Sequence, residues 1–309
     1  MNRIAHVLKG QATTKYSKGL TLVELLVALI LSSLVAIAST ALFATSSAIY
    51  RTNDASQELQ DKSRFAFEMI AQAIRHAGFQ NYSQSKSFGF ATREFQTVTY
   101  APILGFSNSK IATTSNGDDN GQDNRGGFNS SDTIAVRFAG SSRISNSALP
   151  DGSVVDCQGV SQPTPIDAND TALSLFWVKN TGTADGEPEL QCISRGNPTA
   201  SGGAVRNSQV LISGVETFRI VYAVDTSGGS DANQWLTAKE VNDGSLWAGV
   251  RMIRIGIVVR GAPGSAQVSA QPNLLPLGAD FPSVSFTPPQ DTRLRKAFNF
   301  TITLRNPII

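Results

Sequence analysis

From Leu20 to Ala77 the sequence contains neither glycine nor proline, and its first 25 residues, Leu20–Ala44, are apolar almost without interruption. Glu24 is the only charged residue in this run. A helix of 25 residues is about 37 Å long, which exceeds the roughly 30 Å thickness of the hydrocarbon core of a bilayer. The run therefore predicts a helix over residues 20–44 that crosses a membrane or lies in an apolar helix bundle.

The helix is expected to continue past the apolar run as an amphipathic segment over residues 45–78. After the polar stretch Arg51–Gln57, apolar residues recur at helical spacing. These residues are Leu59, Ala66, Phe67, Ile70, Ala73, Ile74 and Ala77. Gly78, which follows Arg75 and His76, is typical of a helix C-terminus. A single helix of about 58 residues would be about 87 Å long, so we expect its two halves to lie in different environments.

The sequence pattern of residues 79–309 predicts a β-rich globular head. Apolar segments with strand character are separated by loops that are dense in Ser, Asn, Gly and Asp. The clearest are TIAVRFA (Thr133–Ala139), LSLFWV (Leu173–Val178), TFRIVYAV (Thr217–Val224), RMIRIGIVVR (Arg251–Arg260) and AFNFTITL (Ala297–Leu304). In the last, Phe298, Phe300, Ile302 and Leu304 alternate with polar residues. The predicted fold class is α+β, with the long helix covering one face of an antiparallel sheet.

Charge is distributed unevenly along the chain. Residues 1–19 contain four basic residues and no acidic one, whereas the rest of the chain contains 22 basic and 24 acidic residues. Because basic residues before a membrane segment stay in the cytoplasm, we expect the head to face outward. The nearly neutral body gives no reason to expect nucleic acid as a partner.

Three alternatives explain the N-terminus. An ordinary signal peptide would be cut after Ala38, but 25 apolar residues are long for its apolar region. A plain signal anchor would merely tolerate Glu24 near the helix end. A short basic leader cut after Gly19 would leave Leu20 as a new N-terminus, with Glu24 close behind it.

The chain has two cysteines, Cys157 and Cys192, both in the head. If the head is exported, a disulfide is the natural interpretation, whereas a cytoplasmic head would keep two free thiols. The membrane segment favours the disulfide, which would close a loop of roughly 36 residues and contribute about 4 kcal/mol in the chain-entropy model.

Enzymatic motifs are missing from the sequence. It has no G-x-S-x-G, P-loop, HExxH or CxxC motif, and His76 is the only histidine outside the basic leader. The stretch Ser115–Gly127 is rich in oxygen ligands, namely Asp118, Asp119, Asn120, Asp123 and Asn124. Calcium is conceivable there, but the spacing differs from an EF-hand, and we favour a solvated loop. We expect no enzyme activity, no cofactor and no metal residues.

The N-terminal stretch KGLTLVELLVALILSSLVAIA resembles the class III signal of type IV pilins and type II secretion pseudopilins. Further segments are similar to the PilW group of minor pilins and, in part, to the related J-type pseudopilins. They are RFAFEMIAQAIRHAGF (Arg64–Phe79), SDTIAVRF (Ser131–Phe138), the two cysteines, ISGVETFRIVY (Ile212–Tyr222) and RKAFNFTITLRN (Arg295–Asn306). Leu20 stands where the family usually has Phe, and loops near 105–130, 140–170 and 225–245 lie outside the resemblance.

The resemblance implies a staged assembly. A prepilin peptidase would remove residues 1–19 by cutting after Gly19 and would methylate the new amine of Leu20. In the filament, Glu24 would then pair with the N-terminal amine of a neighbouring subunit, since an unpaired carboxylate near hydrocarbon costs a few kcal/mol. The protein would lie in the inner membrane with its head in the periplasm, and later at the cell surface in a pilus.

The resemblance also implies a function and partners. The favoured function is a minor pilin that helps to initiate type IV pilus assembly near the fibre tip. Expected partners are other minor pilins, the major pilin, a tip adhesin, the prepilin peptidase and the inner-membrane assembly platform. The alternatives are a minor pseudopilin of a type II secretion system and, from another class, a secreted binding protein or adhesin released by an ordinary signal peptidase.

Overall fold

The computed structural model describes residues 19–80, 101–111, 126–164, 171–180, 186–196, 207–229 and 231–306. The chain divides into two compact units between Tyr50 and Arg51. The first unit contains the apolar part of the long helix. The second contains the amphipathic part of that helix and the β-rich head.

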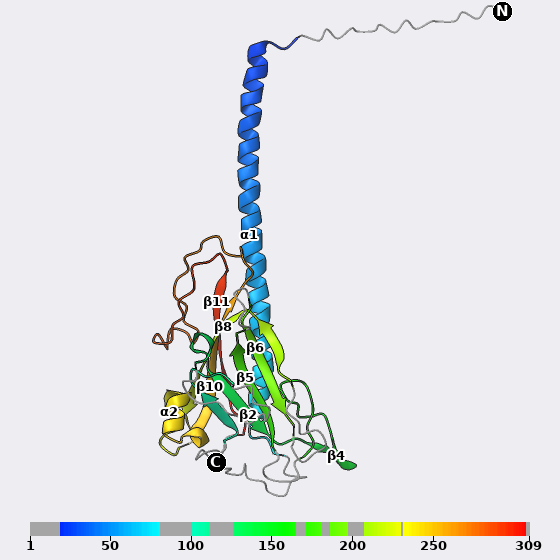
Figure 1. The fold of residues 1–309 in the computed structure, drawn as a ribbon, viewed down its shortest axis with the longest axis vertical. Coiled ribbons are helices and arrows are strands. Elements are labelled where there is room, and N and C mark those ends of the chain that lie inside the picture. The colour runs from blue at the N-terminus through cyan, green and yellow to red at the C-terminus, as the bar shows by residue number, and fades with distance from the viewer. Residues whose placement is uncertain are drawn as a thin grey trace, which may run out of the picture. The chain divides into compact units, whose positions relative to one another are not determined.

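The long helix α1 runs from Leu22 to His76 without interruption (Figure 1). At its start, the hydroxyl of Thr21 accepts a hydrogen bond from the backbone N–H of Glu24 at 3.2 Å, which satisfies one of the free donors of the first turn. At its end, Gly78 adopts a left-handed φ of 68°, as expected of a glycine that terminates a helix. The predicted single helix is confirmed, with both ends within two residues of the expected positions.

In the second unit, α1 buries one stripe of small and aliphatic side chains. Its buried residues are Ala55, Leu59, Ser63, Ala66, Ile70, Ala71, Ala73 and Ile74. Ala77, just past the helix end, is also buried, and Phe67 is partly buried against the core. The apolar spacing read from the sequence therefore identified the buried face of this half.

The head contains two antiparallel sheets and a short ribbon. The five-stranded sheet has the order β1-β2-β5-β6-β7, the four-stranded sheet the order β11-β10-β8-β9, and β3 pairs with β4. The strands are β1 (Ile103–Phe106), β2 (Thr133–Phe138), β3 (Ser142–Arg143), β4 (Asn146–Pro150), β5 (Ala172–Lys179), β6 (Glu189–Arg195), β7 (Gln209–Ser213), β8 (Val215–Val224), β9 (Gln234–Thr237), β10 (Val250–Arg260) and β11 (Arg295–Thr303). All five predicted strands are present, and the α+β class is confirmed.

Short helical elements connect some of the strands. They are η1 (Phe128–Ser130), α2 (Ala238–Asp243) and η2 (Trp247–Gly249). Helix α2 begins with a capping box, in which Thr237 and Glu240 bond to each other's backbone N–H groups. This cap explains why a six-residue helix forms directly after β9.

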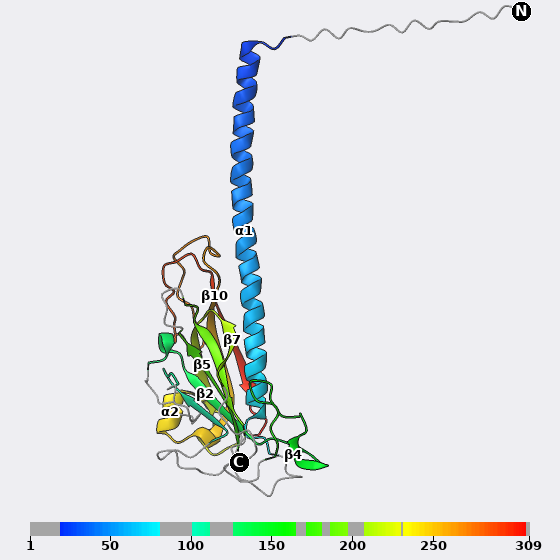
Figure 2. The same ribbon diagram turned by 45° about the vertical axis from the view of Figure 1, so that its right-hand side comes forward.

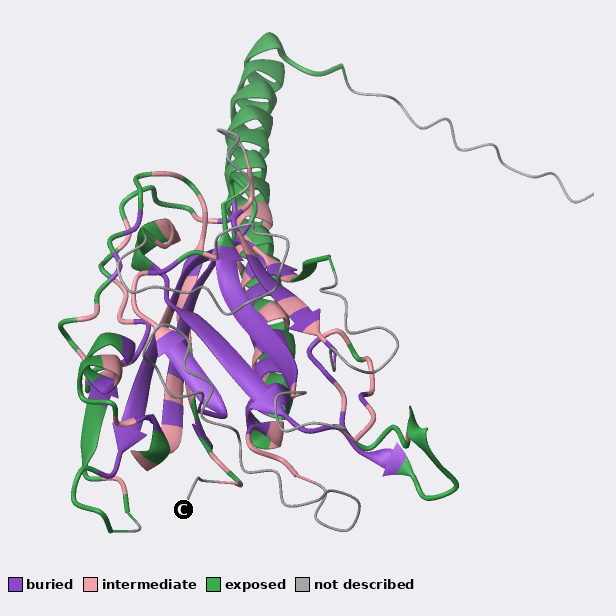
Figure 3. Cartoon of the chain, turned by 60° about the horizontal axis from the view of Figure 1, so that its bottom comes forward, coloured by how far each residue is buried: buried purple, intermediate pink, exposed green. Residues whose placement is uncertain are grey.

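A large hydrophobic core holds the head together. Buried residues of both large sheets and of α1 form a single cluster, and α1 lies along one face of the strands in both side views (Figures 1 and 2). The central strands are buried along nearly their whole length, whereas α1 is exposed from Leu22 to Ser46 (Figure 3). Strands β2, β5, β8 and β10 thus provide the rigid centre on which the surface features are placed.

Candidate functional site

The first candidate site is the apolar surface of α1 in the first unit. Every residue from Gly19 to Thr45 is exposed, and large apolar side chains such as Leu22 (80% exposed) and Phe43 (75% exposed) lie on all sides of the helix. The helix is long and apolar enough to cross a membrane, with a mean hydropathy of 2.5 in its most apolar window. An exposed apolar surface of this extent requires lipid or other apolar helices around it.

Glu24 lies at the beginning of this apolar surface. It occupies the first turn of α1, where the partial positive charge of the helix N-terminus favours a carboxylate. Thr21 caps the backbone N–H of Glu24, so the two residues fix the start of the helix together. Within the described part of the chain, no cation contacts the Glu24 carboxylate. The arrangement presents one exposed acid, three to five residues after Gly19, Leu20 and Thr21, in the otherwise uncharged run Leu20–Ala44.

The second feature is the disulfide between Cys157 and Cys192. It joins the loop after β4 to the middle of β6, with a Cα–Cα distance of 6.4 Å. Both half-cystines are buried, and the backbone N–H of Cys157 donates to the hydroxyl of Ser174 on β5 at 3.0 Å. The predicted disulfide is confirmed, and it fastens an otherwise irregular loop to the five-stranded sheet.

The third feature is a network of buried charges at one end of the four-stranded sheet. Glu216 of β8 accepts from Arg295 Nε at 2.6 Å and from Arg260 Nη1 at 3.2 Å. The side chain of Arg295 is fully buried and also binds Asp291 at 2.5 Å. Glu187 closes the network by accepting from Arg260 at 2.9 Å and from Arg293 at 2.6 Å.

The network changes the protonation equilibria of its members. Burial alone lowers the pKa of Arg295, but the hydrogen bonds that it donates to Asp291 and Glu216 outweigh this effect and raise that pKa. The hydrogen bond from Arg295 lowers the pKa of the Asp291 carboxyl. Arg295 and Asp291 therefore stay ionised at neutral pH, and the network links β8, β10 and β11 to the loop that precedes β6.

A second buried carboxylate, Asp132, joins the two large sheets. Its oxygens accept from the backbone N–H groups of Asn108 and Ile220 at 2.9 and 2.8 Å, and Arg219 lies at 3.3 Å. Its own N–H donates to the carbonyl of Phe218 at 2.7 Å. Burial raises the pKa of Asp132 to about 6, against the opposing effects of Arg219 and the two amides. Asp132 therefore connects the start of β2 to β8.

Comparison with known families decides the class of the protein. Residues 175–306 match the family model described as Type IV Pilus-assembly protein W, and residues 14–40 match the prokaryotic N-terminal methylation motif. The two matches support a type IV pilus minor pilin of the PilW type. The matched part of the head runs from β5 to the end of β11, and the matched N-terminal motif contains Gly19, Leu20 and Glu24.

Comparisons with individual proteins add less. A comparison with curated proteins finds no match. Among solved structures, the chain is similar to the type IV-like pilin TTHA1219 from Thermus thermophilus, with 12% sequence identity and a TM-score of 0.37. The similarity covers 81% of this chain and 98% of that chain.

The structure locates some of the predicted site residues and leaves others as predictions. Gly19 and Leu20 precede α1 and are exposed, while Glu24 is in its first turn. Their roles in cleavage, methylation and charge pairing stay predictions. The loop 115–127 lies outside the described residues except for Gly126 and Gly127. Among the described residues, no group of three or more His, Cys, Asp or Glu side chains is placed to hold a metal ion.

The buried charge network was not predicted. Its bonded pairs are separated by as many as 106 residues, so no local motif in the sequence predicts them. The signal in the sequence was Glu216, a lone acid in the apolar strand VETFRIVYAV, since a buried carboxylate needs a cationic partner.

Removing the disulfide is expected to destabilise the head. In the double variant Cys157→Ala/Cys192→Ala, the unfolded chain regains loop entropy, and the free energy of unfolding should fall by up to about 4 kcal/mol. For a head of this size that corresponds to a decrease in Tm of roughly 8 to 16 °C. Thermal unfolding of the full-length protein in detergent would measure it, with the unmodified protein in reductant as a control. An unchanged Tm would contradict a stabilising role.

Proposed function

We propose that this minor pilin helps to initiate assembly of a type IV pilus, at or near the fibre tip and together with other minor pilins. The observation that carries the proposal is the exposed apolar run Leu20–Ala44, with Glu24 as its only charge, on a chain whose head matches the PilW model. Such a helix can span a membrane before assembly and can later pack against other apolar helices in a bundle. The proposed role is structural, and we propose no enzymatic activity.

The proposed mechanism has three steps. The basic leader keeps residues 1–19 in the cytoplasm and the head in the periplasm, because positive charge opposes translocation. Cleavage after Gly19 creates a charged amine at Leu20, which is methylated. Glu24 then pairs with the amine of a neighbouring subunit while the apolar helices pack, and the low dielectric of the bundle strengthens this pair.

The N-terminus of the mature protein tests the first two steps. Mass spectrometry of the protein recovered from membranes is expected to find a peptide that begins at Leu20 and carries one added methyl group. A peptide that begins at Ser39 would instead identify an ordinary secreted protein, and one that begins at Met1 a signal anchor. Either of these results would contradict the proposed assembly.

A deletion strain tests the assigned machine. Deleting the gene is expected to abolish twitching motility and to leave exoprotein secretion unchanged, because the head matches the PilW model. Restoring the gene on a plasmid should restore motility. The opposite pattern, with secretion lost and motility retained, would assign the chain to a type II secretion system as a minor pseudopilin.

A further inference from the structure

The last strand of the four-stranded sheet, β11, has one edge without a neighbouring strand. The sheet order places β11 at the end, paired only with β10. Leu304 donates to the carbonyl of Arg251, and Gly261 donates to that of Leu294, so even-numbered residues of β11 face β10 in the hydrogen-bonding direction. Because alternate residues of a strand direct their backbone groups to opposite edges, the odd-numbered residues face outward.

At its first residues this outer edge is already occupied by a side chain. The amide of Gln271 accepts from the backbone N–H of Arg295 at 3.1 Å and donates to the carbonyl of Arg293. These are the two bonds that a neighbouring strand would make at this place. Gln271 bonds to no backbone group of β11 after Arg295, so among the described residues the outer edge is open from there on.

The open part of the edge extends over residues 297–303. Asn299, Thr301 and Thr303 are exposed, and Ala297 is partly exposed. In the described part of the chain, no group bonds to the backbone of these four residues on the outer side. The segment AFNFTIT contains neither proline nor charge, the usual means of protecting an edge strand. A free edge of this kind is a template for an added strand.

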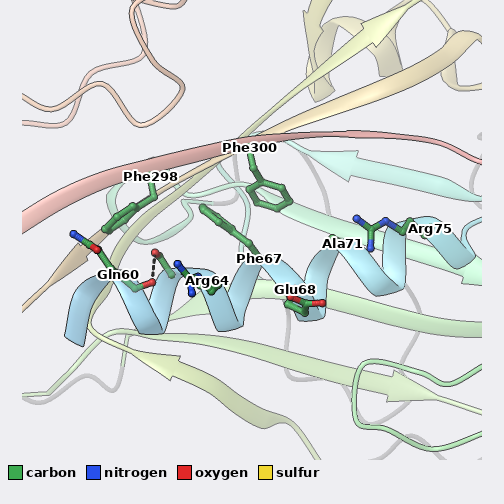
Figure 4. Close-up of a pocket in the computed structure, with 9 residues that line it drawn as sticks. Gln60, Arg64, Phe67, Glu68, Ala71, Arg75, Phe298 and Phe300 are labelled. Atoms are coloured by element: carbon green, nitrogen blue, oxygen red, sulfur yellow. Dashed lines mark hydrogen bonds between the residues drawn. The ribbon is translucent and has the colours of Figure 1, made fainter. Parts of the chain in front are cut away.

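A groove of about 450 Å³ lies between β11 and the second half of α1 (Figure 4). Phe298 and Phe300 point from β11 toward the helix, and Phe67 points from the helix toward β11, with ring centroids of Phe67 and Phe300 3.9 Å apart. Ala71 continues the apolar lining on the helix. The volume is in the range of ligand-binding clefts. A strand added to β11 would direct alternate side chains into this groove.

The polar lining of the groove is basic. Arg64 and Arg75 line it and are exposed, whereas Glu68 is the single acid among its described lining residues. No described residue forms an ion pair with either guanidinium. The two arginines are eleven residues apart on the same face of α1, about 16 Å along the helix axis. That distance corresponds to about five residues of an extended strand.

We infer that β11 captures an extended, acidic segment of a partner subunit by strand addition. The backbone of the segment would pair with residues 297–303, its inward apolar side chains would fill the groove, and its carboxylates would pair with Arg64 and Arg75. Main-chain bonds provide affinity in this mode, while the groove and the arginines select the sequence. The inference concerns the second unit alone and does not depend on the role proposed for Glu24.

A designed peptide tests the inference on the full-length protein in detergent. The probe is fluorescein-labelled VTETVTETV, whose valines and glutamates share one face and whose sequence reads the same in both directions. Fluorescence anisotropy at low salt, with empty micelles as the blank, is expected to show saturable binding. The lysine peptide VTKTVTKTV should bind at least tenfold more weakly. Absence of saturable VTETVTETV binding up to 1 mM would overturn the inference.

Variants separate strand addition from simple adsorption. Thr301→Pro removes an outward N–H without touching the β10 ladder, since proline is tolerated at a free edge. It should weaken binding at least tenfold, and Thr301→Val, which keeps the N–H, should bind normally. Asn299→Pro repeats the test at a second outward position in case Thr301→Pro does not fold. Unchanged binding to a folded proline variant would overturn strand addition.

A charge reversal tests the proposed selectivity. Arg64→Glu/Arg75→Glu is expected to weaken peptide binding at least tenfold, whereas Arg143→Glu, on the separate β3–β4 ribbon, should leave it unchanged. Equal binding by both variants would refute recognition of an acidic segment. These binding measurements use purified protein, so their outcome does not depend on piliation. Piliation tests the proposed function, and the two tests can therefore fail separately.

Discussion

Glu24→Ala is expected to leave the protein in the membrane and to reduce its incorporation into pili at least tenfold. The transfer of alanine into hydrocarbon costs less free energy than that of glutamate, so insertion of the helix should not be impaired. In the assembled bundle, however, the amine of a neighbouring subunit would lose its carboxylate. Leaving one member of a buried ion pair alone costs about 3–5 kcal/mol, which is more than a hundredfold in an equilibrium constant.

Immunoblots of membranes and of sheared pili would measure the two pools, and electron microscopy would count pili per cell. Glu24→Asp, which keeps the charge on a shorter side chain, should retain part of the incorporation. Thr21→Val removes the helix cap but not the carboxylate, and should cost far less. Normal piliation by Glu24→Ala would show that the acid is only tolerated at the helix start.

The helix and its apolar surface were predictable because their signals are local. The absence of Gly and Pro up to Ala77, the 3.6-residue spacing and the glycine at position 78 each act within a few residues of the chain. Glu24 was found in the same way, as the one charge in an apolar run. The structure adds the cap by Thr21, which the pattern Thr-x-x-Glu already suggests.

Strands were predictable where they are long and apolar. The alternation at Phe298, Phe300 and Ile302 correctly gave the core-facing side of β11. Short or polar strands such as β3, β4, β7 and β9 were missed, because their pairing depends on neighbours rather than on their own sequence. The same applies to the order of strands in the two sheets.

The open edge of β11 and the charge network could not be derived from one sequence. Which edge of a strand lacks a partner depends on sheet order, and sheet order is decided by contacts between distant segments. Arg295 and Glu216 are 79 residues apart, yet they form the most buried ion pair of the described head. Both features therefore require the tertiary structure.

Arg295→Ala is expected to lower the free energy of unfolding by about 5 kcal/mol, at the upper end of the range for breaking a buried pair. It would leave Glu216, which is 2% exposed, with Arg260 as its single described ionic partner, and it would open a cavity where the arginine stem packs. The corresponding decrease in Tm is about 10 to 20 °C. Thermal unfolding of the full-length protein in detergent would measure it.

The matched control is Lys239→Ala. Lys239 and Asp243 are 2.5 Å apart, the same distance as Arg295 and Asp291, but both side chains are about half exposed or more. An exposed pair contributes at most about 1 kcal/mol, so this variant should unfold close to the unmodified protein. Equal decreases in the free energy of unfolding of the two variants would show that burial does not determine how much the network stabilises the head.

The pH dependence gives an independent check on Arg295. Because Arg295 lowers the pKa of Asp291 in the folded protein, the pair stabilises the head fully above the ordinary carboxyl pKa of 3.8. This contribution is lost as the pH falls through the lowered value, since the unfolded state then binds the proton more readily. In Arg295→Ala the Asp291 pKa should return toward 3.8, so the stability of the variant should depend less steeply on pH below 4. A slope as steep as that of the unmodified protein would mean that Asp291 owes its lowered pKa to its remaining hydrogen bond with the Arg293 amide rather than to Arg295.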